Sequence, residues 1–414
     1  MDNKRSKFFY YSACKMRSML LFLILFFCVA HAFAATENDE KIRTYLTGDW
    51  YGARQQLASH GISWHGNYVI NAAANIGGRQ NGSSQASSIG SDLTIDFSQL
   101  CDLPGWSFFI SGAFRFGTSL SSKKIGNAFS VQQVFGSQTI RLVDLYLAYS
   151  KEKAFYLKFG RINTGEDFQV SRLFAEFMNN SFNGNPITPN FNFLFSVFPV
   201  STWGMYTEIF PADWFRIKSG IYNNNREIFV NDTHGTYFSF TPSLGALLYT
   251  EWGLLLQHSK DLKGTYLVGS GYSTGKTNHQ LKETVRGNYQ LYVQLEESLI
   301  WKDPHEKEIA PFFTFLYFPE DRNPFPYFFM GGVVTKGLFR LRPEDRISWG
   351  TSWGFYSKEL DTKQTFEGCM EWNYKLQISP YFYIEPNLQY VIRPSGDKNL
   401  SNAWVFGLQS ECLF

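Results

Sequence analysis

Charged side chains of both signs recur at alternate positions in several segments of this 414-residue chain. They lie on the polar face of an apolar–polar alternation, so their apolar neighbours point the other way. Bases and acids that face each other across a narrow, water-filled space set up a transverse field that suits polar, uncharged solutes. Any one of these charges could instead serve only to keep that space hydrated. The charged positions that we predict to line it are Arg115, Lys158, Arg161, Arg216 and Glu371.

Other reactive residue types form no recognisable catalytic or metal-binding motif. The histidines lack the spacing of metal ligands, and no nucleophile elbow, P-loop or zinc motif is present. Cys369 and Cys412 lie on faces of opposite parity, which opposes a disulfide between them. The sequence therefore predicts no cofactor, no metal and no enzymatic activity. A hydrolase whose Ser and His meet only in the folded barrel stays an alternative.

The composition favours strands that have one apolar and one polar face. Aromatic residues make up 18% of the chain, with 41 Phe, 23 Tyr and 11 Trp, and charged residues also make up 18%, below the usual quarter. The mean hydropathy of −0.23 is too low for a bundle of membrane-spanning helices. The apolar content excludes disorder, and a net charge of +2 gives no basic excess for binding nucleic acid.

The period-two alternation predicts long strands. It is clearest in residues 63–76, 106–116, 366–378, 381–393 and 403–414. These segments run to about 10–14 residues, whereas soluble strands average about 5–6 and tilted transmembrane strands need about 9–11. At about 22 residues per strand and connection, the chain has room for about 16 strands. We therefore predict an all-β protein, a transmembrane antiparallel β-barrel of about 16 strands. A secreted β-sandwich or β-solenoid is the alternative.

The N-terminus has the features of a secretory signal peptide, which we assign to residues 1–34. Five basic residues precede the apolar run Met19–Ala30, and two overlapping Ala-x-Ala patterns place the cleavage after Ala32 or Ala34. The run is too short to span a bilayer as a helix, since about 20 residues are needed. Removal of this segment leaves a net charge of about −2 on the exported chain.

The remaining chain is predicted to contain two parts. Residues 35–62 form a periplasmic segment with one short helix, and residues 63–414 form the barrel. Within the barrel, residues 163–202 show little alternation and are rich in Gly, Asn and Pro. Loops this long usually have a function, and we predict that this one folds into the lumen as a constriction loop. Its residues that we expect to contact a solute are Glu166, Asp167, Phe168, Arg172 and Phe182.

Several stretches resemble the carbohydrate-selective porin (OprB-type) family. They are Leu-Thr-Gly-Asp-Trp-Tyr-Gly-Ala-Arg at 46–54, Phe-Gly-Arg at 159–161 followed by Asn-Ser-Phe at 180–182, Glu-Pro-Asn-Leu-Gln-Tyr at 385–390 and the last strand ending in Phe414. The resemblance covers about residues 44–414. It implies a 16-stranded outer-membrane porin that passes monosaccharides by diffusion through a pore narrowed by inserted loops.

The sequence also departs from the family pattern. Tyr51 stands where a second Gly is common, and Ser395 separates Pro394 from Gly396. These changes indicate a divergent member, so no sugar preference is carried over. The family's binding residues can be matched only at Arg161 and over Glu166–Arg172.

These observations together predict a porin in the outer membrane of a Gram-negative bacterium that passes small carbohydrates passively. The expected partners are the permeating sugars, outer-membrane lipid and the barrel-assembly machinery, but not nucleic acid; homo-oligomer formation rests on fold analogy alone. The alternatives are a general or weakly ion-selective diffusion porin, a barrel hydrolase and a plugged structural or adhesive barrel. Sequence does not separate them, because selectivity depends on the pore radius and on the pairing of lumenal charges.

Overall fold

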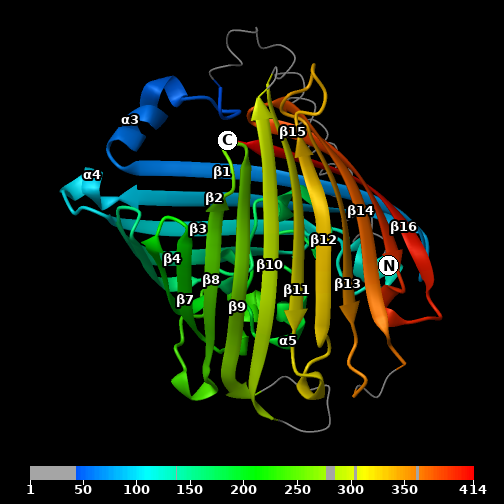
Figure 1. Ribbon diagram of the computed structural model, residues 1–414. Coiled ribbons are helices and arrows are strands. Elements are labelled where there is room, and N and C mark those ends of the chain that lie inside the picture. Colours follow the sequence, from blue (N-terminus) through cyan, green and yellow to red (C-terminus); the bar gives the residue numbers. More distant parts are fainter. Residues whose placement is uncertain (1–42, 137, 277–284, 303–304, 360–362) are drawn as a thin grey trace, which may run out of the picture.

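Sixteen antiparallel strands close into a barrel in this computed structural model (Figure 1). The structure describes residues 43–136, 138–276, 285–302, 305–359 and 363–414, so the predicted signal peptide lies outside the described residues. Each strand pairs with its neighbours in sequence, and β1 pairs with β16 to close the ring. The predicted all-β barrel of about 16 strands is confirmed.

The strands are β1 (Ile62–Gly78), β2 (Gly82–Asp96), β3 (Trp106–Gly117), β4 (Thr139–Lys151), β5 (Phe155–Ile162), β6 (Thr202–Ala212), β7 (Phe215–Asn223), β8 (Ala246–Gln257), β9 (Leu262–Lys276), β10 (Arg286–Lys302), β11 (Glu306–Tyr317), β12 (Tyr327–Lys336), β13 (Arg346–Phe355), β14 (Phe366–Ser379), β15 (Phe382–Ile392) and β16 (Ser401–Leu413). The α-helices are α3 (Ala53–Ser59), α4 (Phe97–Cys101) and α5 (Thr188–Asn192). Single helical turns are η1 (Trp50–Gly52), η2 (Ser121–Ile125), η3 (Thr164–Glu166), η4 (Phe174–Glu176), η5 (Arg226–Phe229), η6 (Asn231–Thr233), η7 (Pro242–Leu244), η8 (Glu320–Arg322) and η9 (Pro394–Gly396).

The predicted short N-terminal helix is present as α3. It is followed by Gly61, whose φ of +82° turns the chain into β1. A side chain at this glycine would meet the backbone oxygen of Asp96 at 2.4 Å, so the close approach to the end of β2 also requires glycine.

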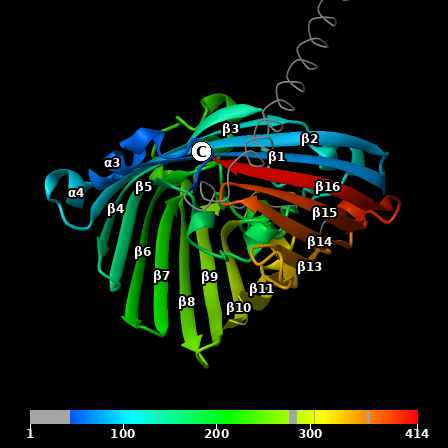
Figure 2. The ribbon, with the colours of Figure 1, turned by 90° about the horizontal axis from the view of Figure 1, so that it is seen from above.

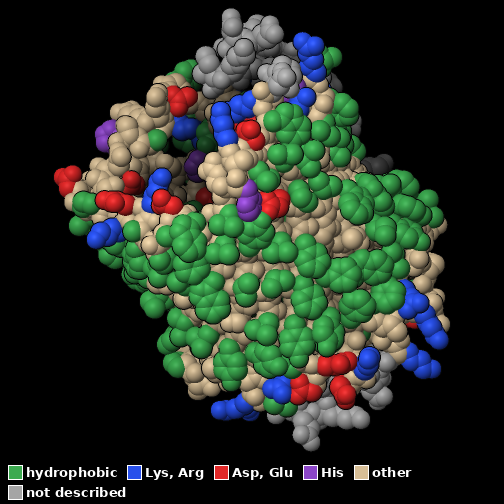
Figure 3. Space-filling model, in the orientation of Figure 1, with side chains coloured by type: hydrophobic (Ala, Val, Ile, Leu, Met, Phe, Trp, Pro, Cys, Tyr) green, Lys and Arg blue, Asp and Glu red, His purple; other side chains and the backbone are tan. Residues whose placement is uncertain are grey.

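The outer surface of the barrel is an apolar belt. Along β16, Trp404, Phe406 and Leu408 are exposed, whereas Ala403, Val405 and Gln409 between and beside them are buried. Figure 3 shows a broad band of apolar side chains with charged residues gathered above and below it. A closed barrel satisfies its backbone groups between strands, and an apolar belt with polar rims is typical of a membrane-spanning barrel. No helix in the described residues is long and apolar enough to cross a membrane.

The two ends of the barrel differ in their connections. The links from β4 to β5, from β6 to β7 and from β14 to β15 are tight turns at the end that carries α3. The long links, which include residues 118–136, 163–201 and 224–245, lie at the opposite end. In outer-membrane barrels the short turns face the periplasm and the long loops face outward.

Two of the long links turn inward, as the view along the barrel in Figure 2 shows. We name residues 118–136 the first inner segment and residues 163–201 the second inner segment. Phe168 of the second segment lies against Tyr249 of β8, and the backbone N–H of Met178 donates to Glu371 of β14. The second segment therefore reaches both sides of the lumen. The inward course of the first segment was not predicted from the sequence.

The inner wall is not uniformly polar, in contrast to the usual barrel pattern. Phe312 and Leu316 of β11 and Phe328 and Met330 of β12 are buried inside the barrel. They form one cluster with the phenylalanines of the two inner segments. This apolar part of the wall holds the inner segments by burial of aromatic surface.

Candidate functional site

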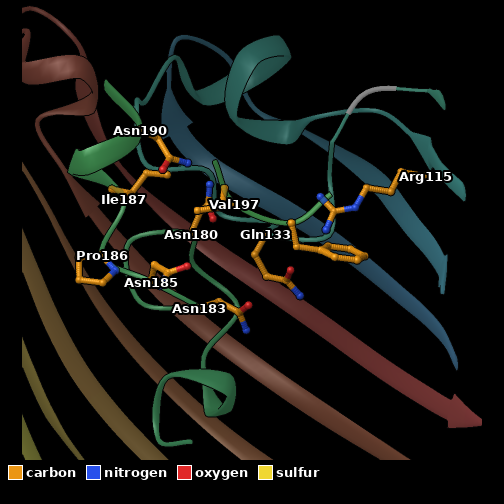
Figure 4. Close-up of a pocket in the computed structure, with 11 residues that line it drawn as sticks. Arg115, Gln133, Asn180, Asn183, Asn185, Pro186, Ile187, Asn190 and Val197 are labelled. Carbon is orange, nitrogen blue, oxygen red and sulfur yellow. The ribbon is translucent and has the colours of Figure 1, made fainter. Parts of the chain in front are cut away.

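A cavity of about 100 Å³ lies between β3 and the two inner segments (Figure 4). Six of its eleven lining residues carry a guanidinium or amide side chain, and none is acidic. The lining residues are Arg115, Gln133, Asn180, Asn183, Gly184, Asn185, Pro186, Ile187, Asn190, Val197 and Phe198. Guanidinium and amide groups supply hydrogen-bond donors, and the amides also supply acceptors.

Arg115 is placed by the alternation of β3. Phe114 and Phe116 on either side of it stack on each other, with their ring centroids 5.0 Å apart, and Phe114 is exposed on the outer surface. Arg115 therefore points inward and is only 7% exposed. Its guanidinium lies 4.9 Å from the ring centroid of Phe198 and points into the cavity in Figure 4. Within the described residues it donates no hydrogen bond, and Nε is buried without a partner.

Two of the cavity asparagines of the second inner segment, Asn183 and Asn185, are held in fixed orientations. Asn185 Nδ2 donates to the backbone oxygens of Gly165 at 2.8 Å and Phe168 at 2.9 Å, and Asn183 Nδ2 donates to Phe177 O at 2.6 Å. Asn190 Oδ1 is buried and accepts no hydrogen bond from the described residues. Fixed amides beside an unused acceptor are a preorganised surface for hydroxyl groups, because little side-chain freedom is lost on binding.

The two inner segments are joined to each other at the cavity. Asn180 N donates to Ser130 O at 2.8 Å, and Gln133 N donates to Met178 O at 3.0 Å. Asn180 and Gln133, which both line the cavity, are thus fixed through their backbones. The cavity wall depends on the contact between the segments, so a change in either one alters its shape.

Two carboxylates of β14 hold these segments against the wall. Glu371 accepts from Met178 N at 2.6 Å and from Asn179 N at 3.0 Å. Glu367 accepts from Ala128 N at 2.8 Å and from Phe129 N at 2.7 Å. Both glutamates are fully buried, so Glu371 lies beneath the second segment and not on the cavity surface.

The start of the second inner segment is tied to β5 and β7. Lys158 Nζ lies 2.7 Å from Asp167 Oδ1, and both side chains are buried. Tyr222 donates its hydroxyl to Asp167 Oδ2 at 2.9 Å, and Lys218 Nζ donates to Asp167 O at 2.8 Å. Burial raises the pKa of the Asp167 carboxyl above its ordinary value, while Lys158 acts in the opposite direction.

The other predicted arginines also have partners. Arg161 is buried and donates to Ser201 O at 2.9 Å and to Tyr237 O. Arg216 lies 3.5 Å from a carboxylate oxygen of Glu208 and 3.6 Å from one of Glu251. Arg172 forms an ion pair with Glu308 and donates to Ser298 Oγ at 2.9 Å. These groups belong to wall-to-loop and strand-to-strand contacts.

The predicted ring contacts are packed against other rings. Phe182 stacks on Phe177 with the centroids 4.6 Å apart, and Phe168 lies 5.1 Å from Tyr249. Neither Phe168 nor Phe182 exposes surface in this structure. Both rings pack the second inner segment onto the wall, whereas Glu166 is exposed.

Of the ten predicted site residues, only Arg115 borders the cavity. The amide residues were missed because they follow no periodic pattern. Their signal was the concentration of asparagine between Asn179 and Asn190, in a stretch that was predicted only to be a constriction. Among the described residues, no three His, Cys, Asp or Glu side chains are grouped as metal ligands.

A wider cavity of about 990 Å³ lies between the β7–β8 and β9–β10 connections, at the end of the long loops. Leu194 of the second inner segment forms part of its wall, next to Asn224 and Arg226. This cavity is a hollow at the end of the long loops, and Arg226, Glu227, Lys276 and Arg286 place charges of both signs on its wall.

Comparison with known proteins finds porins. The model of the family described as carbohydrate-selective porin, OprB family, matches residues 80–414. Porin B of Pseudomonas aeruginosa is 25% identical over 93% of this chain and 94% of its own. The putative porin QuiX of Acinetobacter baylyi is 25% identical over 90% of this chain and 93% of its own. The high-pH structure of Pseudomonas putida OprB has a TM-score of 0.83 and 22% identity, covering 90% of this chain and 99% of that one, which shows the same fold.

Proposed function

The chain belongs to the carbohydrate-selective porin (OprB) family, as a sugar porin of the Gram-negative outer membrane, and we propose that sugars pass it through the cavity beside Arg115. The observation that carries this proposal is a lining of guanidinium and amide groups between two tethered segments. Family and barrel indicate a channel rather than an enzyme. We propose that the protein has no catalytic activity of its own.

In this proposal, a sugar passes because it exchanges its hydrogen bonds with water for hydrogen bonds with the protein. A sugar entering from the outward hollow leaves its hydration shell and regains hydrogen bonds from the asparagine amides and from Arg115. Because these groups are already fixed, the exchange costs little ordering. An apolar solute of equal size leaves the same polar groups without partners, which is unfavourable. Passage is passive diffusion, and its rate depends on how well the solute fits the cavity.

The second inner segment sets the size limit in this proposal. Its support is the set of contacts to β14, β5 and the aromatic cluster, which oppose its displacement by a passing solute. We further propose that residues 1–34 are removed as a signal peptide and that residues 35–62 face the periplasm. The barrel-assembly machinery and the surrounding lipid would be its partners.

Liposome swelling with refolded protein tests the proposal. We expect fast swelling with glucose and arabinose, and slow swelling with sucrose and with a neutral amino acid. Asn183→Trp, which fills the cavity, should reduce the glucose rate at least several-fold. Asn399→Trp, on an exposed residue of the β15–β16 connection, is the matched control and should leave the rate unchanged. Rates ordered only by solute size, with no effect of Asn183→Trp, would indicate general diffusion along another route.

A further inference from the structure

We propose that the preferred solutes of this porin are acidic monosaccharides, sugars that carry one carboxylate, such as aldonates and uronates. This inference rests on the proposed passage through the cavity beside Arg115. It adds a substrate class within the carbohydrates, and it follows from how charge is distributed around that cavity.

Arg115 differs from the other buried cations of the lumen. Lys158 is paired with Asp167, Lys218 with Glu251 and Lys375 with Glu176, at 2.7 to 3.2 Å. The buried Arg141 and Arg161 donate to backbone oxygens. Arg115, equally buried, has neither an ion pair nor a hydrogen bond to the described residues. Its contact is the ring of Phe198.

The cavity itself supplies no counter-charge. None of its lining residues is acidic, and the carboxylates of the nearby β14 already accept backbone N–H groups of the inner segments. A guanidinium that is largely removed from solvent and faces no carboxylate is unfavourable, because an anion does not offset its lost hydration. A carboxylate entering the cavity would therefore be stabilised there more than a neutral hydroxyl.

Geometry favours a carboxylate attached to a polyhydroxyl chain. The central carbon of the Arg115 guanidinium lies 4.9 Å from the Phe198 ring centroid, and the guanidinium points into the cavity (Figure 4), where its N–H groups can meet an anion. Guanidinium and carboxylate match as a planar, two-bond pair. The asparagine amides elsewhere in the cavity, including the unused acceptor Asn190 Oδ1, suit the hydroxyl groups of the same molecule. One cation balances a monoanion better than a phosphate dianion.

Flux from preloaded liposomes separates this inference from the proposed function. Potassium gluconate, with valinomycin to carry the counter-ion, is compared with glucose, glucose 6-phosphate and glucosamine. We expect gluconate to leave about three- to tenfold faster than glucose, and glucosamine to be slower than glucose. Arg115→Gln should bring the gluconate-to-glucose flux ratio to one or below, and glucose flux itself should fall to a smaller extent than gluconate flux, because Arg115 also donates to sugar hydroxyls in the proposed function. Arg340→Gln, on an exposed residue of the β12–β13 turn, removes the same charge and should leave the ratio unchanged.

A second measurement needs no variant. In wild-type protein, gluconate should inhibit glucose flux more strongly than mannitol does at equal concentration. Glucose flux without a gluconate preference, or a preference that persists in folded, heat-modifiable Arg115→Gln, would overturn the inference and leave the sugar porin standing. If glucose 6-phosphate left the liposomes faster than gluconate, the inference would also be overturned, and the result would indicate recognition of a phosphate. Ionic conductance without flux of any monosaccharide would instead overturn the proposed function.

Discussion

Glu367 and Glu371 lie four residues apart on the inner face of β14, and each carboxylate accepts two consecutive backbone N–H groups of a different inner segment. One strand thereby holds both segments in place. Asn373 and Asn387 also donate to Glu371 Oε1, at 3.0 and 2.8 Å. The buried Glu371 carboxylate thus accepts four hydrogen bonds. A buried charge needs such partners to replace the water that it has lost.

Glu371→Gln should loosen the second inner segment. The amide keeps one acceptor but turns an NH₂ group toward a backbone N–H, so two donors face each other and a bond of about 1.5–3 kcal/mol is lost. We expect higher single-channel conductance and faster sucrose flux. Glu359→Gln, on an exposed residue of the β13–β14 connection, is the control. A variant with unchanged conductance and unchanged sucrose exclusion would show that this carboxylate does not hold the segment.

Deletion of residues 179–190 should change the size limit for solutes more than Glu371→Gln does. It removes the asparagine-rich wall of the cavity and the ring of Phe182, but leaves the strands that close the barrel. Single-channel conductance should rise and exclusion by size should weaken. If conductance stayed at the wild-type value in a heat-modifiable barrel, the constriction would lie elsewhere.

Gly350→Val should displace the aromatic packing of the same segment. A Cβ at Gly350 would meet Phe177 Cε1 at 2.8 Å and Phe182 Cε1 at 3.0 Å, and overpacking of this kind costs about 1–3 kcal/mol. We expect faster proteolysis between residues 170 and 190, with the strand signal of circular dichroism unchanged. Gly331→Val is the comparison, since a Cβ there comes no nearer than 3.2 Å to another atom. Equal protease resistance of Gly350→Val and wild type would contradict the close fit.

The turn between β12 and β13 gives a pH-dependent contribution to stability. Arg342 donates to both oxygens of Asp345, at 2.9 and 3.0 Å, and Gln377 N donates at 3.0 Å. Burial acts to raise the pKa of Asp345, but these hydrogen bonds outweigh it and hold the pKa below its ordinary value. The stabilisation is therefore present above the ordinary pKa of about 4 and is lost as pH falls through the lower folded value.

Asp345→Asn should thus be less stable than wild type by about 2–3 kcal/mol at pH 7, with the difference shrinking below pH ~4. Denaturant unfolding in detergent micelles at several pH values measures this. Asp397→Asn, on a partly buried residue of the β15–β16 connection, serves as the control. A difference that stayed constant down to acid pH would assign the effect to lost packing and not to the charge.

The barrel was predictable because lipid and lumen impose opposite preferences on alternate residues. Trp404 and Phe406 face outward and Gln409 inward, as the alternation predicted. Arg115 was predictable for the same reason, since parity on β3 places it inside. At Phe312 and Leu316 the inner wall is itself apolar, because the second inner segment covers it. An apolar–polar alternation does not predict such a covered part of the wall.

The cavity was only partly predictable. Its amides lie on a loop without periodicity, and their positions depend on contacts with strands far along the chain. The first inner segment was missed because its docking depends on Glu367 of β14, which is 239 residues from its partner Ala128 in the sequence. Lys158, Asp167 and Glu371 were predicted to line the pore, but sequence alone did not show that these groups join the loop to the wall.

The tethers on β14 also constrain the order of assembly. The Met178–Glu371 bond joins residues 193 apart in sequence, and the Ala128–Glu367 bond joins residues 239 apart. Contacts this distant form late, because the intervening chain must first be brought together. The inner segments thus have no β14 to bind until the last strands arrive. A barrel that is still assembling would therefore have an unconstricted lumen until β14 is in place. Its size limit for solutes would arise only when the last strands close the ring.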